Sequence, residues 1–225
     1  CRNYFRDMIK LQLTPKQNIF FCSDPHYNHA GIVRGTSSWD GKRGCRDFDT
    51  LEEHNNTLVN NINNTVGVDD ILFCLGDWNF GDYKSGENKS GTIEFREKIN
   101  CKNIHLILGN HDSEIRKSDE LKYVFSSVQD YLELQVSEFS KKQGVKAFKQ
   151  RIIMSHYSFR VWNYMHKNEG SWMLFGHSHG SLTEVFGKSM DVGFDTHPKF
   201  KPYSYQEIKY LLSKKEMVCL DHHSK

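Results

Sequence analysis

The sequence predicts an α/β fold, and two observations carry this prediction. Short apolar runs recur along the chain, each closed by polar or glycine-rich residues, which is typical of buried strands. Helix-compatible segments lie between several of these runs, and strands that alternate with helices favour an α/β arrangement. The chain has 225 residues, 37% hydrophobic and 13% aromatic, which is enough for a full core. We therefore expect one domain over residues 1–225.

The expected elements follow from local patterns. Residues 51–66 predict a helix because Leu51, Leu58, Val59 and Ile62 gather on one helical face, and residues 91–99 predict a second helix. Residues 131–136 and 145–153 flank a short basic segment at 141–144, which predicts a β-hairpin. Two loops are expected, at 34–46 and 81–91. The expected buried strands are residues 19–22, 71–75, 104–108, 152–154 and 172–175.

Composition argues against several classes of protein. The 30 basic and 28 acidic residues give a net charge of only +2, so an extended surface for nucleic acid is not indicated. No apolar run approaches the roughly 18 residues of a membrane span, and no leader segment opens the chain. The six cysteines form no CxxC pair. We therefore expect reduced thiols in a cytoplasmic protein without a membrane partner.

Polar side chains follow each of the five apolar runs. Ligands of open α/β sheets bind at the carboxyl ends of strands, where loops can converge on a rigid support. We therefore expect these side chains to meet at one place. They are Asp24 and His26, then Asp77, then Asn110, His111 and Asp112, then His156, and finally His177 and His179.

Carboxylate oxygens and neutral imidazole nitrogens suit divalent first-row metals, and this set exceeds what one ion requires. We predict a two-metal site in which Asp77 is the bridge, because a carboxylate can offer one oxygen to both ions. Two ions about 3.5 to 4 Å apart lower the pKa of a bridging water and stabilise the attacking and leaving oxygens of a displacement at phosphorus. Hydrolysis of a phosphate ester is the predicted chemistry.

The motifs DPH, GD, GNHD, SHY and GHSH, in this order over residues 24–179, resemble those of the calcineurin-like metallophosphoesterase superfamily. The surrounding segments GDWNFG, GSW and MDVGFD, with His29 and Trp162, are similar to the small single-domain bacterial and phage-type members. The resemblance implies two mixed β-sheets packed as a sandwich and flanked by helices, the four-layer fold of this superfamily.

The resemblance also implies roles for individual residues. A hydroxide bridging the two metals would attack phosphorus, while His111 would protonate the leaving oxygen or stabilise its charge. We expect Mn²⁺, and iron, zinc, nickel or cobalt would also suit these ligands. Asp24, His26 and His179 would hold one metal, Asn110, His156 and His177 would hold the other, and Asp77 would bridge them.

Two departures from the protein serine/threonine phosphatases of the superfamily matter. Those enzymes carry GDxxDRG and GNHE, whereas this chain has GDWNFGD and GNHD. Phe80 occupies the position of the second acid, so that acid cannot orient His111, and the arginine that follows it is missing. Asp24, Asp82 and Asp112 are the candidates to supply the missing charge. A phosphoprotein substrate is not expected.

Other residues have two interpretations each. His29 is either a substrate or supporting group, or a cap for the next segment, and Asp112 is either catalytic or a helix N-cap. Arg34, with Lys42, Arg43 and Arg46, forms either a phosphate-facing loop or a solvated one. Trp162, like Trp39 and Trp78, either stacks on a substrate ring or packs in the core. Asp191 and Asp195 either close a late strand against the site or cap a turn.

Three functions remain in view. The complete ligand set favours a metal-dependent phosphoesterase that acts on a phosphate mono- or diester. A nucleotide-like substrate is one candidate for this ester. A nuclease would share the motifs but would normally have a basic groove. A non-catalytic binding scaffold on the same fold would have lost several ligands or His111. The sequence leaves the substrate, the native metals and the oligomeric state open.

Overall fold

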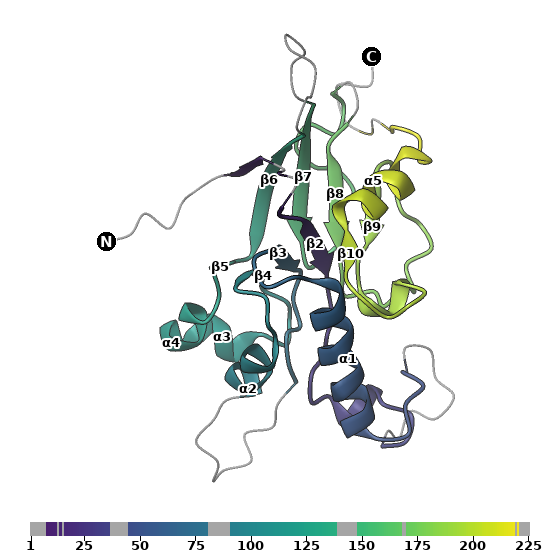
Figure 1. Ribbon diagram of the computed structural model, residues 1–225. Helices are drawn as coiled ribbons and strands as arrows, with labels where there is room; N and C mark the ends of the chain where they lie inside the picture. The colour runs from purple at the N-terminus through teal and green to yellow at the C-terminus, as the bar shows by residue number, and fades with distance from the viewer. Residues whose placement is uncertain are drawn as a thin grey trace.

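The computed structural model describes residues 8–12, 14, 16–36, 45–80, 91–138, 148–167, 170–218 and 220. Within these ranges the chain forms two five-stranded sheets, with orders β10-β2-β3-β4-β5 and β1-β6-β7-β8-β9 (Figure 1). The first sheet consists of β2 (Ile19–Cys22), β3 (Ile71–Cys74), β4 (Asn103–Ile107), β5 (Ser127–Gln129) and β10 (Tyr203–Ser204). The second consists of β1 (Ile9–Gln12), β6 (Tyr131–Ser137), β7 (Lys149–Ser155), β8 (Trp172–Phe175) and β9 (Ser189–Asp191).

Both sheets are mixed. In the first, β10 runs antiparallel to β2 and the other neighbours are parallel. In the second, only the β6–β7 pair is antiparallel. The α/β class with two mixed sheets and flanking helices is therefore confirmed. The predicted hairpin is confirmed by the β6–β7 pairing, while its expected turn at 141–144 lies outside the described residues.

Helices cover the outer face of the first sheet (Figure 1). Helix α1 (Leu51–Thr65) begins at Thr50, whose hydroxyl accepts a hydrogen bond from the backbone N–H of Glu53 at 3.1 Å. It buries Leu58 and Ile62, as the sequence pattern predicts. The other helices are α2 (Gly91–Lys98), α3 (Ser113–Lys117), α4 (Asp119–Tyr123) and α5 (Tyr205–Ser213), with short 3-10 turns at Ala30–Ile32 and Phe194–Thr196.

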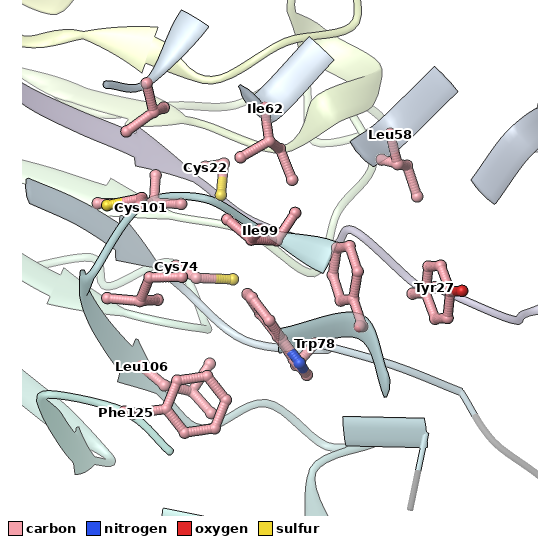
Figure 2. Packing of buried hydrophobic residues seen from close by; sticks show 14 of the residues in the cluster. Cys22, Tyr27, Leu58, Ile62, Cys74, Trp78, Ile99, Cys101, Leu106 and Phe125 are labelled. Carbon is pink, nitrogen blue, oxygen red and sulfur yellow. The ribbon is translucent and has the colours of Figure 1, made fainter. Parts of the chain in front are cut away.

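One core cluster lies between these helices and the first sheet. Figure 2 shows Leu58 and Ile62 of α1 above Cys22 and Cys74 of neighbouring strands, with Trp78 beside them. All five side chains are at most 1% exposed, so each contributes on the order of 1 to 3 kcal/mol of hydrophobic stabilisation. Of the six cysteines, Cys22, Cys45, Cys74 and Cys101 are free thiols, as expected, and Cys1 and Cys219 lie outside the described residues.

A second cluster fills the space between the two sheets. Phe21 and Phe73 stack here with ring centroids 5.5 Å apart, and residues of β6, β7 and α5 pack against them. Strands β2, β3 and β8 are buried along their whole length because both of their faces are covered. This packing fixes the strand ends to which the polar residues are attached.

The strand register brings those ends together. Strands β2, β3 and β4 are parallel neighbours, and so are β7, β8 and β9, so their carboxyl ends lie at one edge of each sheet. Backbone hydrogen bonds then join the two sheets at this edge, such as Ser23 N–H to Val192 O at 3.1 Å. In the described ranges, no helix has the length and apolar character that a membrane crossing requires.

Candidate metal centre

Two groups of metal-ligand side chains meet where the strand ends of both sheets converge. Each group takes residues from loops of both sheets, and within a group the ligand atoms lie within 4.8 Å of one another. The convergence of separate strand ends therefore occurs as the sequence predicts. The groups are Asp24, His26 and His179, and Asp77, His156 and His177.

Asp77 lies between the two groups. Its Oδ2 atom is 3.5 Å from Nε2 of His26 and 3.5 Å from Nε2 of His156. Asn110 joins the second group, since its Oδ1 atom is 3.0 Å from the same His156 nitrogen. One carboxylate oxygen placed equally close to a nitrogen of each group can contact two cations at once. This is the geometry expected of a bridging ligand.

The backbone is strained where it presents these ligands. Asp24, His26, Asp77, His177 and His179 all have positive φ angles, between 46° and 65°. Only glycine adopts this left-handed region without cost, and each other residue there costs on the order of 1 kcal/mol or more. Such strain concentrates at functional sites because the surrounding fold must hold it. Residue types and spacing alone gave no signal for it.

Close packing explains two of the motif glycines. A Cβ atom on Gly109 would lie 2.7 Å from the backbone nitrogen of Asp77 and would overlap its Oδ1 atom. A Cβ atom on Gly176 would overlap Ser23 Oγ and Asp24 Oδ2. Any side chain at these positions would displace a carboxylate of the centre. The loop after β4 can therefore pack this closely on the loop after β3 only because residue 109 is glycine.

The charge state of the centre fits cations. Asp24 Oδ1 and His26 Nε2 are buried and have no hydrogen-bond partner. Burial raises the pKa of Asp24 to about 6, although His179 and His156 lower it, and burial lowers the pKa of His26 below its usual value. A bound divalent cation would compensate both desolvated groups, since it accepts electron pairs from each. The residues present therefore fit metal binding.

Hydrogen bonds orient three of the imidazoles. His156 Nδ1 lies 2.7 Å from the carbonyl of Leu75, so it carries the proton and leaves the Nε2 lone pair directed at Asp77 and Asn110. His179 Nδ1 lies 2.7 Å from Asp195 Oδ2, and its Nε2 is 3.7 Å from Asp24 Oδ1. The Nδ1 atom of His26 lies 3.2 Å from that of His29. In each case Nε2 is the atom left for a metal.

Arg46 and Asp195 support the first group from behind. The Arg46 guanidinium donates to both oxygens of Asp195 at 2.8 Å and to the backbone carbonyls of Asp24 and Pro25. Burial opposes the charge of Asp195, but Arg46 and His179 hold the pKa of this carboxyl well below its usual range. Because Arg46 is only 4% exposed, the expectation that it belongs to a phosphate-facing or solvated loop is wrong. Asp195 closes against the site, one of its two expected roles.

Asp112 has a role that neither of its two interpretations anticipated. It occupies the N-cap position of α3 but makes no capping hydrogen bond with its side chain. Instead, its buried carboxylate accepts hydrogen bonds from the backbone N–H groups of Gly109, Asp77 and Trp78, at 2.8 to 2.9 Å. It therefore ties the loop after β3 to the loop after β4, which holds Asp77 beside Asn110.

Aromatic contacts surround His111. Its ring lies 4.8 Å from that of Phe80 and 5.5 Å from that of His26, in edge-to-face arrangements. Phe80 in turn stacks flat on His29, with centroids 3.7 Å apart. No carboxylate of the described ranges hydrogen bonds to the His111 ring, and Asp82 lies outside them. Among the described residues, His111 is therefore held by ring contacts, with Phe80 and His26.

A cavity of about 410 Å³ opens above the centre and is lined by His29 and His111 together with His26, Asp77 and Asn110. The volume is that of a small-molecule pocket. His29 therefore lies at the site, where it contacts His26 from one side. Burial lowers the pKa of His29 to about 4, with a smaller contribution from His111, so His29 is neutral near pH 7.

Other substrate candidates are not brought to this cavity. The guanidinium of Arg34 is paired with Asp47 and Asp49. Trp162 packs in a core cluster with Met165 and Met173, which is the second of its two interpretations, and Trp78 is fully buried. Lys42, Arg43 and Trp39, together with most of the two expected loops, lie outside the described residues.

Two relatives match most of the length of this chain. The chain is 26% identical over 208 residues to the uncharacterized protein MJ1445 of Methanocaldococcus jannaschii. This match covers 90% of this chain and 95% of that protein. It is 25% identical over 197 residues to the Gene 66 protein of Mycobacterium phage L5, covering 79% of this chain and 86% of the relative.

Among solved structures, the protein of unknown function AQ665 from Aquifex aeolicus matches with a TM-score of 0.55 and 19% identity, over 87% of this chain and 99% of that one, which shows a shared fold. The model of the calcineurin-like phosphoesterase family matches residues 17–181, which is more than half of the chain and includes both groups of ligands. The chain therefore belongs to the calcineurin-like phosphoesterase family.

Proposed function

We propose that this protein is a two-metal phosphoesterase. The observation that carries the proposal is the position of Asp77 Oδ2, 3.5 Å from a nitrogen of each ligand group. Manganese is the metal we expect first, since mixed nitrogen and oxygen ligands suit it. In this proposal Asp24, His26 and His179 would hold one ion, Asn110, His156 and His177 would hold the other, and Asp77 would be a ligand to both.

The bound ions would supply a water activated at neutral pH and positive charge that stabilises the phosphoryl oxygens. The side chains of the protein would position the ligand loops and His111. Asp112 and Arg46 hold the loops in place, so that the ligands need little rearrangement to bind. The ring of His111 is positioned by Phe80 and His26 at the edge of the cavity, where it can donate a proton to the leaving oxygen.

Phosphate mono- and diesters are both candidate substrates, and the cytoplasmic location remains a prediction. The test compares p-nitrophenyl phosphate with bis-p-nitrophenyl phosphate across a series of Mn²⁺, Fe²⁺, Co²⁺, Ni²⁺ and Zn²⁺. At least one ester should be hydrolysed with at least one metal. Failure with every ester and metal would contradict the proposal.

Asp77→Asn provides the matched variant. Because Asp77 contacts both groups, its replacement should lower the rate by at least about 100-fold, more than the loss typical of residues that only support a ligand. Asp69→Asn is the control, since the Asp69 side chain is 83% exposed and, among the described residues, forms an ion pair with Lys102 at the surface. Equal rates for the two variants would remove Asp77 from the mechanism.

A further inference from the structure

A second cavity adjoins the metal centre and has no role in the chemistry described so far. Its volume is about 430 Å³, and it shares Gly109, Asn110 and His156 with the loops that form the centre. Asn110 lines both this cavity and the one above the metal centre, so a substrate whose phosphorus lies over the metals has this second cavity beside it. We call it the aromatic cavity, because Tyr131, Tyr157 and Phe159 also line it.

Tyr131 and Tyr157 are exposed, and Phe159 is partly buried against a core cluster. Tyr157 is 48% exposed, and its ring meets that of His177 at 4.8 Å and that of His156 at 5.1 Å. Tyr131 and Phe159 lie nearly parallel, with centroids 6.2 Å apart and planes 20° from each other. Exposed large rings beside a catalytic centre are suited to stacking on a flat ligand. An aliphatic ester would leave these faces in contact with water.

Arg116 and Asp130, which both line the aromatic cavity, form a neutral ion pair. Arg116 donates two hydrogen bonds to Asp130, at 2.8 Å and 2.5 Å, and both side chains remain about half or more exposed. Because Asp130 neutralises Arg116, the cavity lacks the excess positive charge that would select a further phosphate. The pair offers both acceptor oxygens and guanidinium donors at its exposed edge. Such an edge matches the mixed donors and acceptors of a nucleobase.

We propose that the aromatic cavity binds the base of a nucleoside phosphate, while the phosphoryl group lies over the metal centre. This proposal rests on the proposed phosphoesterase function and names its substrate class. Tyr157 stacks on the base, Phe159 and Tyr131 form the wall of the cavity, and the pair of Arg116 and Asp130 contacts the polar edge.

Binding of adenosine, which has no phosphate, tests the cavity separately from catalysis. Isothermal titration calorimetry on the chelator-treated protein should detect binding, and Tyr157→Leu and Phe159→Leu should each weaken it at least about fivefold, the low end of the effect of losing one stacking ring. Phe159→Leu is included because Phe159 has no ring contact with a metal ligand. Tyr123→Leu is the matched control, since Tyr123 is 78% exposed and lies outside both cavities.

Kinetics provide the second readout. The ratio of kcat/KM for adenosine monophosphate over glycerol phosphate, or for their methyl esters if only diesters react, should exceed one. This ratio should fall at least about fivefold in Tyr157→Leu and Phe159→Leu. Melting temperatures of the variants identify any that fail to fold.

The two proposals fail in different ways. Absence of adenosine binding at millimolar concentration, equal binding in all variants, or a ratio that neither variant changes would overturn the base subsite, even with an active enzyme. If the wild-type protein hydrolyses no ester, the phosphoesterase proposal fails, and adenosine binding that depends on Tyr157 and Phe159 would still support the cavity as a binding site.

Discussion

Replacement of Asp195 by asparagine should destabilise the protein and weaken metal binding together. The Asp195 carboxylate accepts two hydrogen bonds from Arg46 at 2.8 Å and one from His179 at 2.7 Å. The side chains of Arg46 and Asp195 are only 2% and 15% exposed, so solvent screens this pair weakly. An asparagine would keep the shape of the side chain but leave the buried guanidinium without a counter-charge.

The expected magnitude follows from this burial. Removing one partner of a buried ion pair costs about 3 to 5 kcal/mol, and an asparagine oxygen can retain part of the hydrogen bonding, so we expect a loss of about 3 kcal/mol. For a chain of this size that corresponds to a decrease in Tm of roughly 6 to 12 °C. Loss of the charge behind His179 should also weaken metal affinity about 10- to 100-fold.

Denaturant unfolding of the chelator-treated protein measures the first effect, and titration with Mn²⁺ measures the second. Asp47→Asn is the matched control, because Asp47 also pairs with an arginine but its side chain is 87% exposed. An exposed pair contributes at most about 1 kcal/mol. If both variants lost the same stability, or if Asp195→Asn bound Mn²⁺ like the wild-type protein, the argument from burial would be refuted.

Three further outcomes are expected. Gly109→Ala should lower the rate measured in steady-state kinetics at least about tenfold, because the added Cβ would overlap Asp77 Oδ1. Gly170→Ala is the control, since a Cβ there would meet no atom closer than 3.4 Å. It should affect stability through its φ of 71° but leave the rate constant unchanged. Burial lowers the pKa of His105 to about 4, so the contribution of His105 to stability is complete above pH 6.5 and decreases as the pH falls toward 4. His105→Gln should remove up to about 3 kcal/mol of this pH dependence of the free energy of urea unfolding. An unchanged pH profile in the variant would contradict this prediction. Removal of metals with EDTA should lower Tm by roughly 5 to 10 °C, since an ion at 100 times its Kd stabilises the folded state by about 2.7 kcal/mol. Addition of Mn²⁺ should restore the original Tm. A Tm unaffected by EDTA would indicate that no ion binds the folded state.

The strands that carry the site could be predicted because each is a largely buried apolar run with an abrupt polar end, and β2, β3 and β8 are buried along their whole length. Strands β2 and β8 have the predicted bounds, β3 ends one residue earlier than predicted, and β4 begins and ends one residue earlier. Strands β9 and β10 were not predicted, because three and two residues are too few for a periodic pattern. Helix α5 was also missed, although Ser204 and Glu207 form a capping box whose spacing is visible in the sequence.

The supporting residues of the site could not be predicted from local patterns. Arg46 and Asp195 are separated by 149 positions, and only the fold brings them together. The sequence identifies the residue types of the ligands but not the positive φ angles of the backbone at Asp24 and His177. Asp112 resembles a helix cap because it occupies the N-cap position of α3. Its carboxylate instead accepts hydrogen bonds from three backbone N–H groups of two loops.

The central claim is that two metal ions share Asp77. Electron paramagnetic resonance of the protein titrated with Mn²⁺ tests it most directly, because manganese ions about 3.5 to 4 Å apart with a common carboxylate oxygen couple magnetically. We predict the spectrum of a coupled ion pair at two equivalents in the wild-type protein, and its loss in Asp77→Asn. A spectrum of isolated ions at every ratio, in a protein that binds Mn²⁺, would contradict the account.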